Sequence, residues 1–233
     1  MAIIDIVYPK HCPVCLCALM PGKTLICEPC RKKLKTVVDP VCFKCGRPLR
    51  SALREYCPDC EKNPPAFISN TAWAEYGSFY IRRMLSEVKY HGNRQLLDYP
   101  CRDFASRLMP LVKRWQAEAL IPVPIHKNRL RQRGYNQADE IAVRLGKHLK
   151  LPVDSTSLVR RSETSAQKTL GRAERALNLL SAFSWQSVPR KYHSVILVDD
   201  IYTTGATLNA CTGVLLRSGI EKVYSVCLSI GRS

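Results

Sequence analysis

The chain has 233 residues, enough for one mid-sized domain and a small appendage, and its 46% hydrophobic fraction excludes large-scale disorder. Its 36 lysines and arginines against 19 aspartates and glutamates give a formal charge of +17, which favours polyanionic or phosphorylated ligands. No apolar run approaches the roughly 18–20 residues of a membrane-spanning helix, and the first residues lack the features of a secretory signal. We therefore expect a cytoplasmic protein in which disulfides are uncommon.

The first 60 residues contain nine of the twelve cysteines, and eight of these form four C-x-x-C pairs. Each of the first two pairs recurs thirty residues later, which indicates two copies of one structural unit. Two C-x-x-C turns supply the four thiolates of a tetrahedral zinc site with no open position, so the metal is structural. We expect two structural Zn²⁺ sites with the ligands Cys12, Cys15, Cys27, Cys30, Cys42, Cys45, Cys57 and Cys60.

The sequence leaves details of this cysteine module open. Disulfides and thiol redox chemistry are less favoured than zinc, because the expected compartment is reducing and redox work needs one reactive pair rather than four. The spacing fits both a sequential and a cross-braced pairing of the C-x-x-C units, and Cys17 is close enough to be an alternative ligand. Basic residues after the second pair either contact nucleic acid or form a solvated face; they are Arg31, Lys32, Lys33 and Lys35.

Asn63-Pro64-Pro65 marks a boundary, because two prolines stiffen the chain and discourage a continuing helix. We expect a double zinc-ribbon domain over residues 1–65 and a second domain over 66–233. Apolar periodicity in the second domain predicts helices over 79–90, 95–114, 136–149 and 207–217, and strands over 71–76, 119–123, 195–198 and 223–228. This alternation predicts an α/β fold with a mainly parallel sheet flanked by helices.

The segment VILVDDIYTTGAT, from Val195 to Thr207, joins a buried strand to a helix through two adjacent carboxylates and a Thr/Gly turn. Neighbouring carboxylates repel each other, and they suit a place where they accept hydrogen bonds from a vicinal diol or lie near a divalent cation. The turn supplies backbone N–H groups, hydroxyls and the positive end of a helix dipole, which suit a phosphate. The segment therefore predicts a ribose-phosphate site, although single Asp or Thr residues in such a turn also act as helix caps.

These thirteen residues resemble the signature with which type I phosphoribosyltransferases bind phosphoribosyl pyrophosphate (PRPP). Further blocks resemble the ComF/GntX family, in which a double zinc ribbon precedes a phosphoribosyltransferase-like domain. The resemblance covers most of the chain. The blocks are the C-x-x-C repeat, Val88-Lys89-Tyr90-x-Gly92, Arg133-Gly134-Tyr135-Asn136-Gln137, and the series Thr164-x-x-Gln167, Arg175-x-x-Asn178 and Ala182-Phe183.

The resemblance implies a role for each matched residue. Asp199 and Asp200 would hold the ribose hydroxyls, and a loop with Lys127 and Arg129 would hold pyrophosphate together with Mg²⁺. The 5′-phosphate would lie on Thr203, Thr204, Gly205, Ala206 and Thr207. The 160–178 stretch would close over the ligand; its basic residues are Arg160, Arg161, Lys168, Arg172 and Arg175, with Lys168 and Arg172 joining the two aspartates as catalytic candidates.

Three functions are consistent with these features. The resemblance implies a protein that binds PRPP or a phosphorylated ribose and handles single-stranded DNA during competence or DNA uptake. Residues 82–175, with 20 basic and 9 acidic residues, agree with this. The alternatives are an active phosphoribosyltransferase, for which no base-recognition pocket is identifiable, and an adaptor that docks a helicase or a DNA-uptake channel protein. Five aromatic residues either stack on bases or belong to the core; they are Tyr76, Phe79, Tyr80, Tyr90 and Tyr135.

Overall fold

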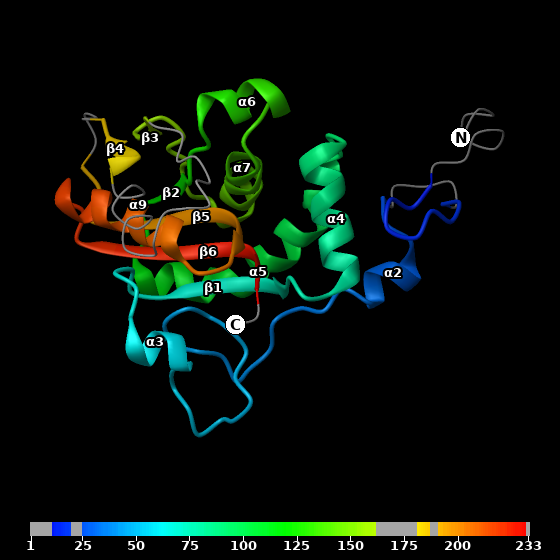
Figure 1. Cartoon of the computed structure of the whole chain (residues 1–233), viewed down its shortest axis with the longest axis horizontal. Coiled ribbons are helices and arrows are strands. Elements are labelled where there is room, and N and C mark those ends of the chain that lie inside the picture. The colour runs from blue at the N-terminus through cyan, green and yellow to red at the C-terminus, as the bar shows by residue number, and fades with distance from the viewer. Residues whose placement is uncertain (1–10, 20–24, 162–180, 187–190, 232–233) are drawn as a thin grey trace, which may run out of the picture.

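The computed structural model describes residues 11–19, 25–161, 181–186 and 191–231. Its centre is a four-stranded sheet with the strand order β1-β6-β5-β2, in which all neighbouring strands are parallel. The strands are β1 (Asn70–Glu75), β2 (Ala119–Pro122), β5 (Ser194–Tyr202) and β6 (Lys222–Ile230). All four lie where the sequence predicts buried strands, and the predicted α/β class is confirmed (Figure 1).

Helices cover both faces of this sheet because its strands are apolar on both sides. Successive residues of β5 face opposite ways, so Val195 and Leu197 belong to one core cluster while Ile196 and Val198 belong to the other. Helices α4 (Phe79–Tyr90), α5 (Asp98–Trp115) and α7 (Gln137–Leu149) pack into the cluster with Ile196. Helix α9 (Ala206–Arg217) packs into the cluster with Val195.

Short elements complete the described chain. The turn η1 (Arg94–Leu97) precedes α5, and α6 (Lys127–Arg133) follows β2. Strands β3 (Leu158–Arg160) and β4 (Phe183–Trp185) form a separate antiparallel pair beside α9. Helices α2 (Glu28–Lys32) and α3 (Pro58–Lys62) lie in the cysteine-rich part. Every helix among the described residues is too short or too polar to traverse a lipid bilayer.

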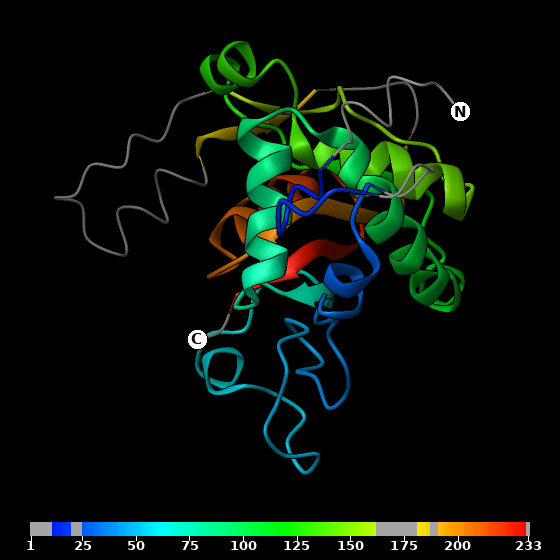
Figure 2. The ribbon, with the colours of Figure 1, turned by 90° about the vertical axis from the view of Figure 1, so that its right-hand side faces the viewer.

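The two halves of the cysteine-rich part pack against different parts of the α/β unit. Residues 11–19 and 25–34 are the described part of the first ribbon, whose Val14 and Ile26 join the core cluster of α4 and α5. Residues 41–62 form the second ribbon, whose cysteines join the cluster that contains Tyr202 and Ile230. Figure 1 shows the first ribbon beyond α4, and Figure 2 shows the second ribbon extending away from the sheet beside β1.

Two elements differ from the sequence-based expectation. Strand β5 does not end at Val198 but continues to Tyr202, because β6 is equally long and pairs with it as far as Ile230. The stretch expected as a loop after β2 forms helix α6, which begins after His126 and ends at Gly134. His126 accepts a hydrogen bond from the Asn128 N–H, and Gly134 has a φ of 77°, so both ends of this short helix are capped.

Candidate zinc and phosphate-ribose sites

The eight cysteines of the C-x-x-C pairs lie in two groups of four, and the pairing is sequential rather than cross-braced. Within each group the sulfur atoms lie within 4.8 Å of one another. The Sγ atoms of Cys15 and Cys27 are 3.6 Å apart, as are those of Cys45 and Cys57. A tetrahedral zinc with Zn–S bonds of about 2.3 Å separates its sulfurs by about 3.8 Å, so both groups fit a structural Zn²⁺ ion.

The thirty-residue repeat of the sequence is also a repeat of structure. The antiparallel bridge between His11 and Ala18 recurs between Val41 and Pro48. In each copy the residue directly after the first C-x-x-C pair has a left-handed backbone conformation. It is Leu16 in the first copy, with φ of 63°, and Gly46 in the second, with φ of 74°. The side chain of Leu16 is exposed, whereas a Cβ at residue 46 would lie 2.5 Å from a backbone oxygen of β1, so only the second copy requires glycine.

The two groups differ in their surroundings. All four cysteines of the second group are buried, whereas Cys15 in the first group is exposed. Cys17 lies beside the first group, with its Sγ 3.1 Å from that of Cys15, but it is not among the four clustered sulfurs. All twelve cysteines of the chain lie in the described residues, and all are free thiols rather than disulfides.

The acidic pair of the predicted ribose site lies on β5 beyond the point where the neighbouring strand ends. Strand β2 pairs with β5 only as far as Val198, and the following Asp199 and Asp200 are half-buried. The backbone N–H of Asp200 donates to Oδ1 of Asp199 at 2.8 Å. Lys89, near the end of α4, places its Nζ 2.6 Å from Oδ2 of Asp200. One carboxylate of the pair is therefore neutralised by a lysine from a distant part of the chain.

Asp199 has an unusual protonation equilibrium. Burial raises its pKa well above the ordinary value, and the adjacent charge of Asp200 raises it further. The ammonium of Lys89 and the hydrogen bond from the Asp200 N–H act in the opposite direction, but they do not outweigh burial. The pair therefore favours one proton or a bound cation over two free negative charges.

The threonine turn leads from the acidic pair into α9. Thr203 and Thr204 are exposed, and Thr204 Oγ1 accepts from the Ala206 N–H at 3.4 Å. Among the described residues, no hydrogen bond to the backbone N–H of Thr204 or Gly205 is found. Gly205 itself is buried, but amides without a partner at the start of a twelve-residue helix have the chemistry of an anion site.

Gly205 is required at this turn for two reasons. Its φ is 76°, in the left-handed region. A Cβ built there would lie 2.4 Å from the hydroxyl oxygen of Tyr202, whose buried ring packs edge-on against Phe67. The buried ring of Tyr202 therefore lies against the inner side of the turn and leaves no room for a side chain at residue 205. The sequence predicts that the backbone on the outer side of the turn is open to the ligand.

Two of the motifs quoted in the sequence meet beside this site. Tyr135 donates a hydrogen bond to the backbone oxygen of Val88, next to Lys89. Asn136 donates from Nδ2 to the backbone oxygen of Val123 at 3.0 Å, directly after β2. Val123 in turn donates from its N–H to Val198 O at 2.8 Å. The motifs thus fix the end of α4 and the end of β2 next to the acidic pair.

Other predicted site residues are not brought to the acidic pair by any interaction found. Lys127 and Arg129 are exposed on α6. Arg160 and Arg161 contact β4, where Arg160 lies over the Phe183 ring and Arg161 donates to Ser184. The other predicted residues of this stretch lie outside the described residues; they are Thr164, Gln167, Lys168, Arg172, Arg175 and Asn178.

The five aromatic residues considered for base stacking divide into two groups. Phe79 and Tyr90 are exposed, and Tyr90 has the guanidinium of Arg133 over its ring. The others pack in part against the core cluster of α4 and α5; they are Tyr76, Tyr80 and Tyr135.

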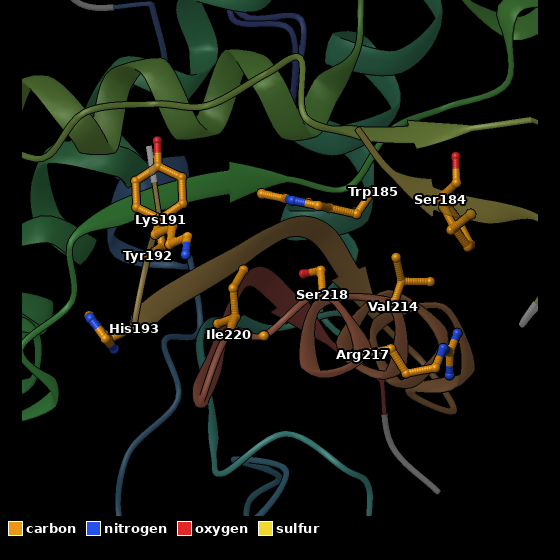
Figure 3. Close-up of a pocket in the computed structure, with 11 residues that line it drawn as sticks. Ser184, Trp185, Lys191, Tyr192, His193, Val214, Arg217, Ser218 and Ile220 are labelled. Carbon is orange, nitrogen blue, oxygen red and sulfur yellow. The ribbon is translucent and has the colours of Figure 1, made fainter. Parts of the chain in front are cut away.

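A separate cavity of about 660 Å³ lies at the other end of the sheet, where β5 begins and α9 ends. Trp185 and Tyr192 line it, and Figure 3 shows Lys191 and His193 at one end of the lining and Arg217 at the other. Six residues of extended strand separate His193 from Asp199, or about 20 Å. The cavity therefore shares no residue with the predicted ribose-phosphate site.

Sequence reasoning missed two residues at these sites. Lys89 stands in the quoted Val88-Lys89-Tyr90-x-Gly92 block, which is the signal that points to it. Arg47, in the second ribbon, donates from Nη2 to the backbone oxygen of Thr203 at 2.9 Å. These two residues are 156 positions apart, and nothing in the local sequence of either indicates the contact.

Comparisons with known proteins agree with this architecture. The double zinc ribbon domain family matches residues 3–61. Competence protein F of Haemophilus influenzae is 32% identical over 221 residues, which cover 91% of this chain and 93% of that protein. Competence protein ComFC of Bacillus subtilis is 29% identical, over 83% of this chain and 79% of the relative. DNA utilization protein YhgH of Escherichia coli is 27% identical, over 94% and 96%. With a relative of this similarity over nearly its whole length, the chain belongs to the ComF/GntX family.

Proposed function

We propose that this chain binds PRPP or another phosphorylated ribose at Asp199–Thr207, and that it handles single-stranded DNA in a competence or DNA-utilisation role. The observation that carries the first part is the acidic pair followed, two residues later, by a turn with exposed threonines at a helix start. The amides of Thr204 and Gly205 in this turn have no hydrogen-bond partner in the part of the chain that the structure describes. The names of the relatives, competence protein and DNA utilization protein, support the second part.

The chemistry of the pair suits a ribose. Asp200, which is paired with Lys89, accepts a hydrogen bond from one ribose hydroxyl. Asp199, with its raised pKa, either accepts from the second hydroxyl or donates to it. The amides of Thr204 and Gly205 then bind the 5′-phosphate. Mg²⁺, when bound with the pyrophosphate group, supplies positive charge that favours ionisation of Asp199.

The DNA part of the proposal has a candidate surface in the cavity of Figure 3. Trp185 and Tyr192 offer aromatic faces for stacking bases, and Lys191 and Arg217 offer positive charge for the phosphates. Because this cavity lies at the end of the sheet opposite the acidic pair, the proposal predicts that PRPP and DNA bind without excluding each other.

Calorimetric titration of the full chain with PRPP and Mg²⁺ tests the ribose part. We expect saturable binding that Asp200→Asn weakens at least tenfold, whereas Asp98→Asn, which removes an exposed carboxylate paired with Arg144, leaves it unchanged. The absence of heat at millimolar PRPP would contradict the proposal. Release of pyrophosphate with an added acceptor, lost in Asp200→Asn, would instead establish an active transferase.

Intrinsic fluorescence tests the DNA part, because Trp185 is half-buried whereas Trp73 and Trp115 are buried. Oligothymidine should quench the emission, with an affinity that falls steeply as salt rises. Arg217→Ala should weaken this binding more than Lys113→Ala, which removes the same charge from an exposed position on α5. If the two variants weaken DNA binding equally, the cavity is not the DNA-binding surface. If the protein binds neither DNA nor PRPP tightly, an adaptor role is favoured.

A further inference from the structure

Arg47 connects the second cysteine group to the end of the sheet. Its side chain is only 8% exposed, and it follows Cys45 by two residues. Its guanidinium donates three hydrogen bonds, to three different segments. These are Nη1 to Oδ2 of Asp59 at 2.6 Å, Nη2 to the backbone oxygen of Thr203 at 2.9 Å, and Nε to the backbone oxygen of Gly231 at 3.2 Å.

The bond to Thr203 fixes the orientation of the turn. In a trans peptide the carbonyl oxygen and the following N–H lie in the peptide plane and point in opposite directions across the C–N bond. Arg47 draws the Thr203 oxygen toward the second ribbon, so the N–H of Thr204 points away from it. This N–H is one of the amides of the turn for which no hydrogen bond is found among the described residues.

The neighbouring chain is fixed from the same side. The Gly231 N–H donates to Tyr202 O at 2.7 Å, and Gly231 O accepts from Arg47, so the ends of β5 and β6 are held together by the arginine. Nearby, Asn70 at the start of β1 donates from Nδ2 to the Cys45 backbone oxygen at 2.8 Å. The second ribbon is therefore hydrogen-bonded to the start of β1 and to the residues that follow β5 and β6.

Comparison of the two ribbons shows that a zinc ribbon does not itself need this arginine. The thirty-residue repeat places Cys17 at the position of Arg47 and Pro29 at the position of Asp59. The backbone bond from Cys12 N–H to Cys17 O has the same 2.8 Å length as the bond from Cys42 N–H to Arg47 O. The backbone bond that closes the first C-x-x-C loop thus forms with either Cys17 or Arg47 in place. The arginine occurs only in the copy that contacts the threonine turn.

We propose that Arg47 is a positioning residue through which the second zinc site holds the phosphate-binding turn, so that zinc binding there and anion binding at the turn favour each other. This inference rests on the proposed function, in which the turn binds a phosphorylated ribose. Because coupling between two sites is reciprocal, each ligand raises the affinity of the protein for the other by the same factor. The first cysteine group has no such contact with the turn among the described residues, and its zinc is not coupled.

Hydrogen exchange without any ligand tests the positioning role by itself. In Arg47→Ala we expect faster exchange of the amides of Ala206 in the turn and of Gly231, which are hydrogen-bonded in the wild type, with Arg47→Lys intermediate. Arg107→Ala is the matched control, because Arg107 also donates to two backbone oxygens, those of Val37 and Trp73, away from the turn. Unchanged exchange in folded Arg47→Ala, or the same acceleration in Arg107→Ala, would overturn the inference.

Zinc release, followed with a chromogenic chelator, tests the coupling in the full chain. Saturating PRPP with Mg²⁺ should slow release of one of the two zinc ions about tenfold and leave the other unchanged. This difference should vanish in Arg47→Ala or, if that variant does not fold, decrease in Arg47→Lys. Equal release with and without PRPP, in a protein that calorimetry shows to bind PRPP, would overturn the inference alone. A protein that binds no PRPP but shows faster turn exchange in Arg47→Ala would instead refute the proposed function.

Discussion

Nζ of Lys89 lies 2.6 Å from Oδ2 of Asp200, and the two side chains are 19% and 18% exposed. This ion pair joins the end of α4 to β5. When both carboxyls are ionised, they and the Lys89 ammonium together carry one net negative charge. This arrangement explains how two neighbouring aspartates persist near the carboxyl end of an interior strand, since an unpaired partly buried charge is costly.

Replacement of Lys89 by methionine should therefore destabilise the protein. The variant leaves Asp200 without its partner beside Asp199, and we expect a loss of about 1–3 kcal/mol in the free energy of unfolding. The double variant Lys89→Met/Asp200→Asn should regain most of this loss, because it removes the unpaired charge. Urea denaturation of both variants measures the difference, and an equally unstable double variant would show that the lysine acts by packing rather than by charge.

Replacement of Asp199 by asparagine should stabilise the ligand-free protein in a pH-dependent way. Because the pKa of Asp199 is raised in the folded state, the protonated carboxyl contributes stability that is fully present below its unfolded pKa and is lost as pH rises through the folded value. Asparagine cannot ionise and keeps the oxygen that accepts from the Asp200 N–H. The gain in Tm over the wild type should therefore be larger at pH 8 than at pH 5. A gain that does not depend on pH, or a loss at pH 8, would contradict the raised pKa.

Gly205→Ala should damage both the turn and its ligand binding. The added Cβ meets the Tyr202 ring at a residue with φ of 76°, and we expect a cost of about 2–4 kcal/mol. Gly219→Ala is the control, because Gly219 also has a positive φ, of 95°, but nothing lies within 4 Å of its added Cβ. That variant should cost about 1 kcal/mol and keep wild-type PRPP affinity. Similar costs in thermal unfolding of the two variants would show that the Tyr202 contact is unimportant.

The zinc content should follow the sequential grouping of the cysteines. Native mass spectrometry should find two zinc ions in the wild type, one in folded Cys45→Ser, and two in Cys17→Ser, because Cys17 lies outside both groups. Removal of the second zinc should also cause the larger fall in Tm, since its four cysteines are buried in the core cluster of Tyr202 and Ile230. Two zinc ions in Cys45→Ser would show that another residue replaces the ligand.

Features that depend on local sequence could be predicted well. The C-x-x-C repeats predict the eight clustered thiols because ligand spacing is a local property, and the apolar run from Val195 to Val198 predicts a central parallel strand. The continuation of β5 through Asp199 to Tyr202 could not be predicted, because its polar residues break the pattern and the partner strand β6 holds them extended. Helix α6 was missed for a related reason, since Leu130 is its only aliphatic residue and that residue is exposed.

Contacts between distant residues could not be predicted from the sequence. Lys89 and Asp200 are brought together by the packing of α4 against the sheet, and Arg47 reaches Thr203 only because the second ribbon packs beside β1. Each of these contacts depends on the placement of a whole element, whereas the motif around Asp199 is complete within thirteen residues. The roles of Lys127, Arg129, Lys168 and Arg172 toward a ligand remain predictions.

Hydrogen exchange of the wild-type chain with and without PRPP and Mg²⁺ tests the ribose-phosphate site most directly, because it shows where the ligand binds. We predict strong protection of the amides of residues 203–207, with little change at residues 183–186 and 191–193 around the separate cavity. Unchanged exchange of the threonine turn at saturating PRPP, or protection confined to the cavity, would contradict the account.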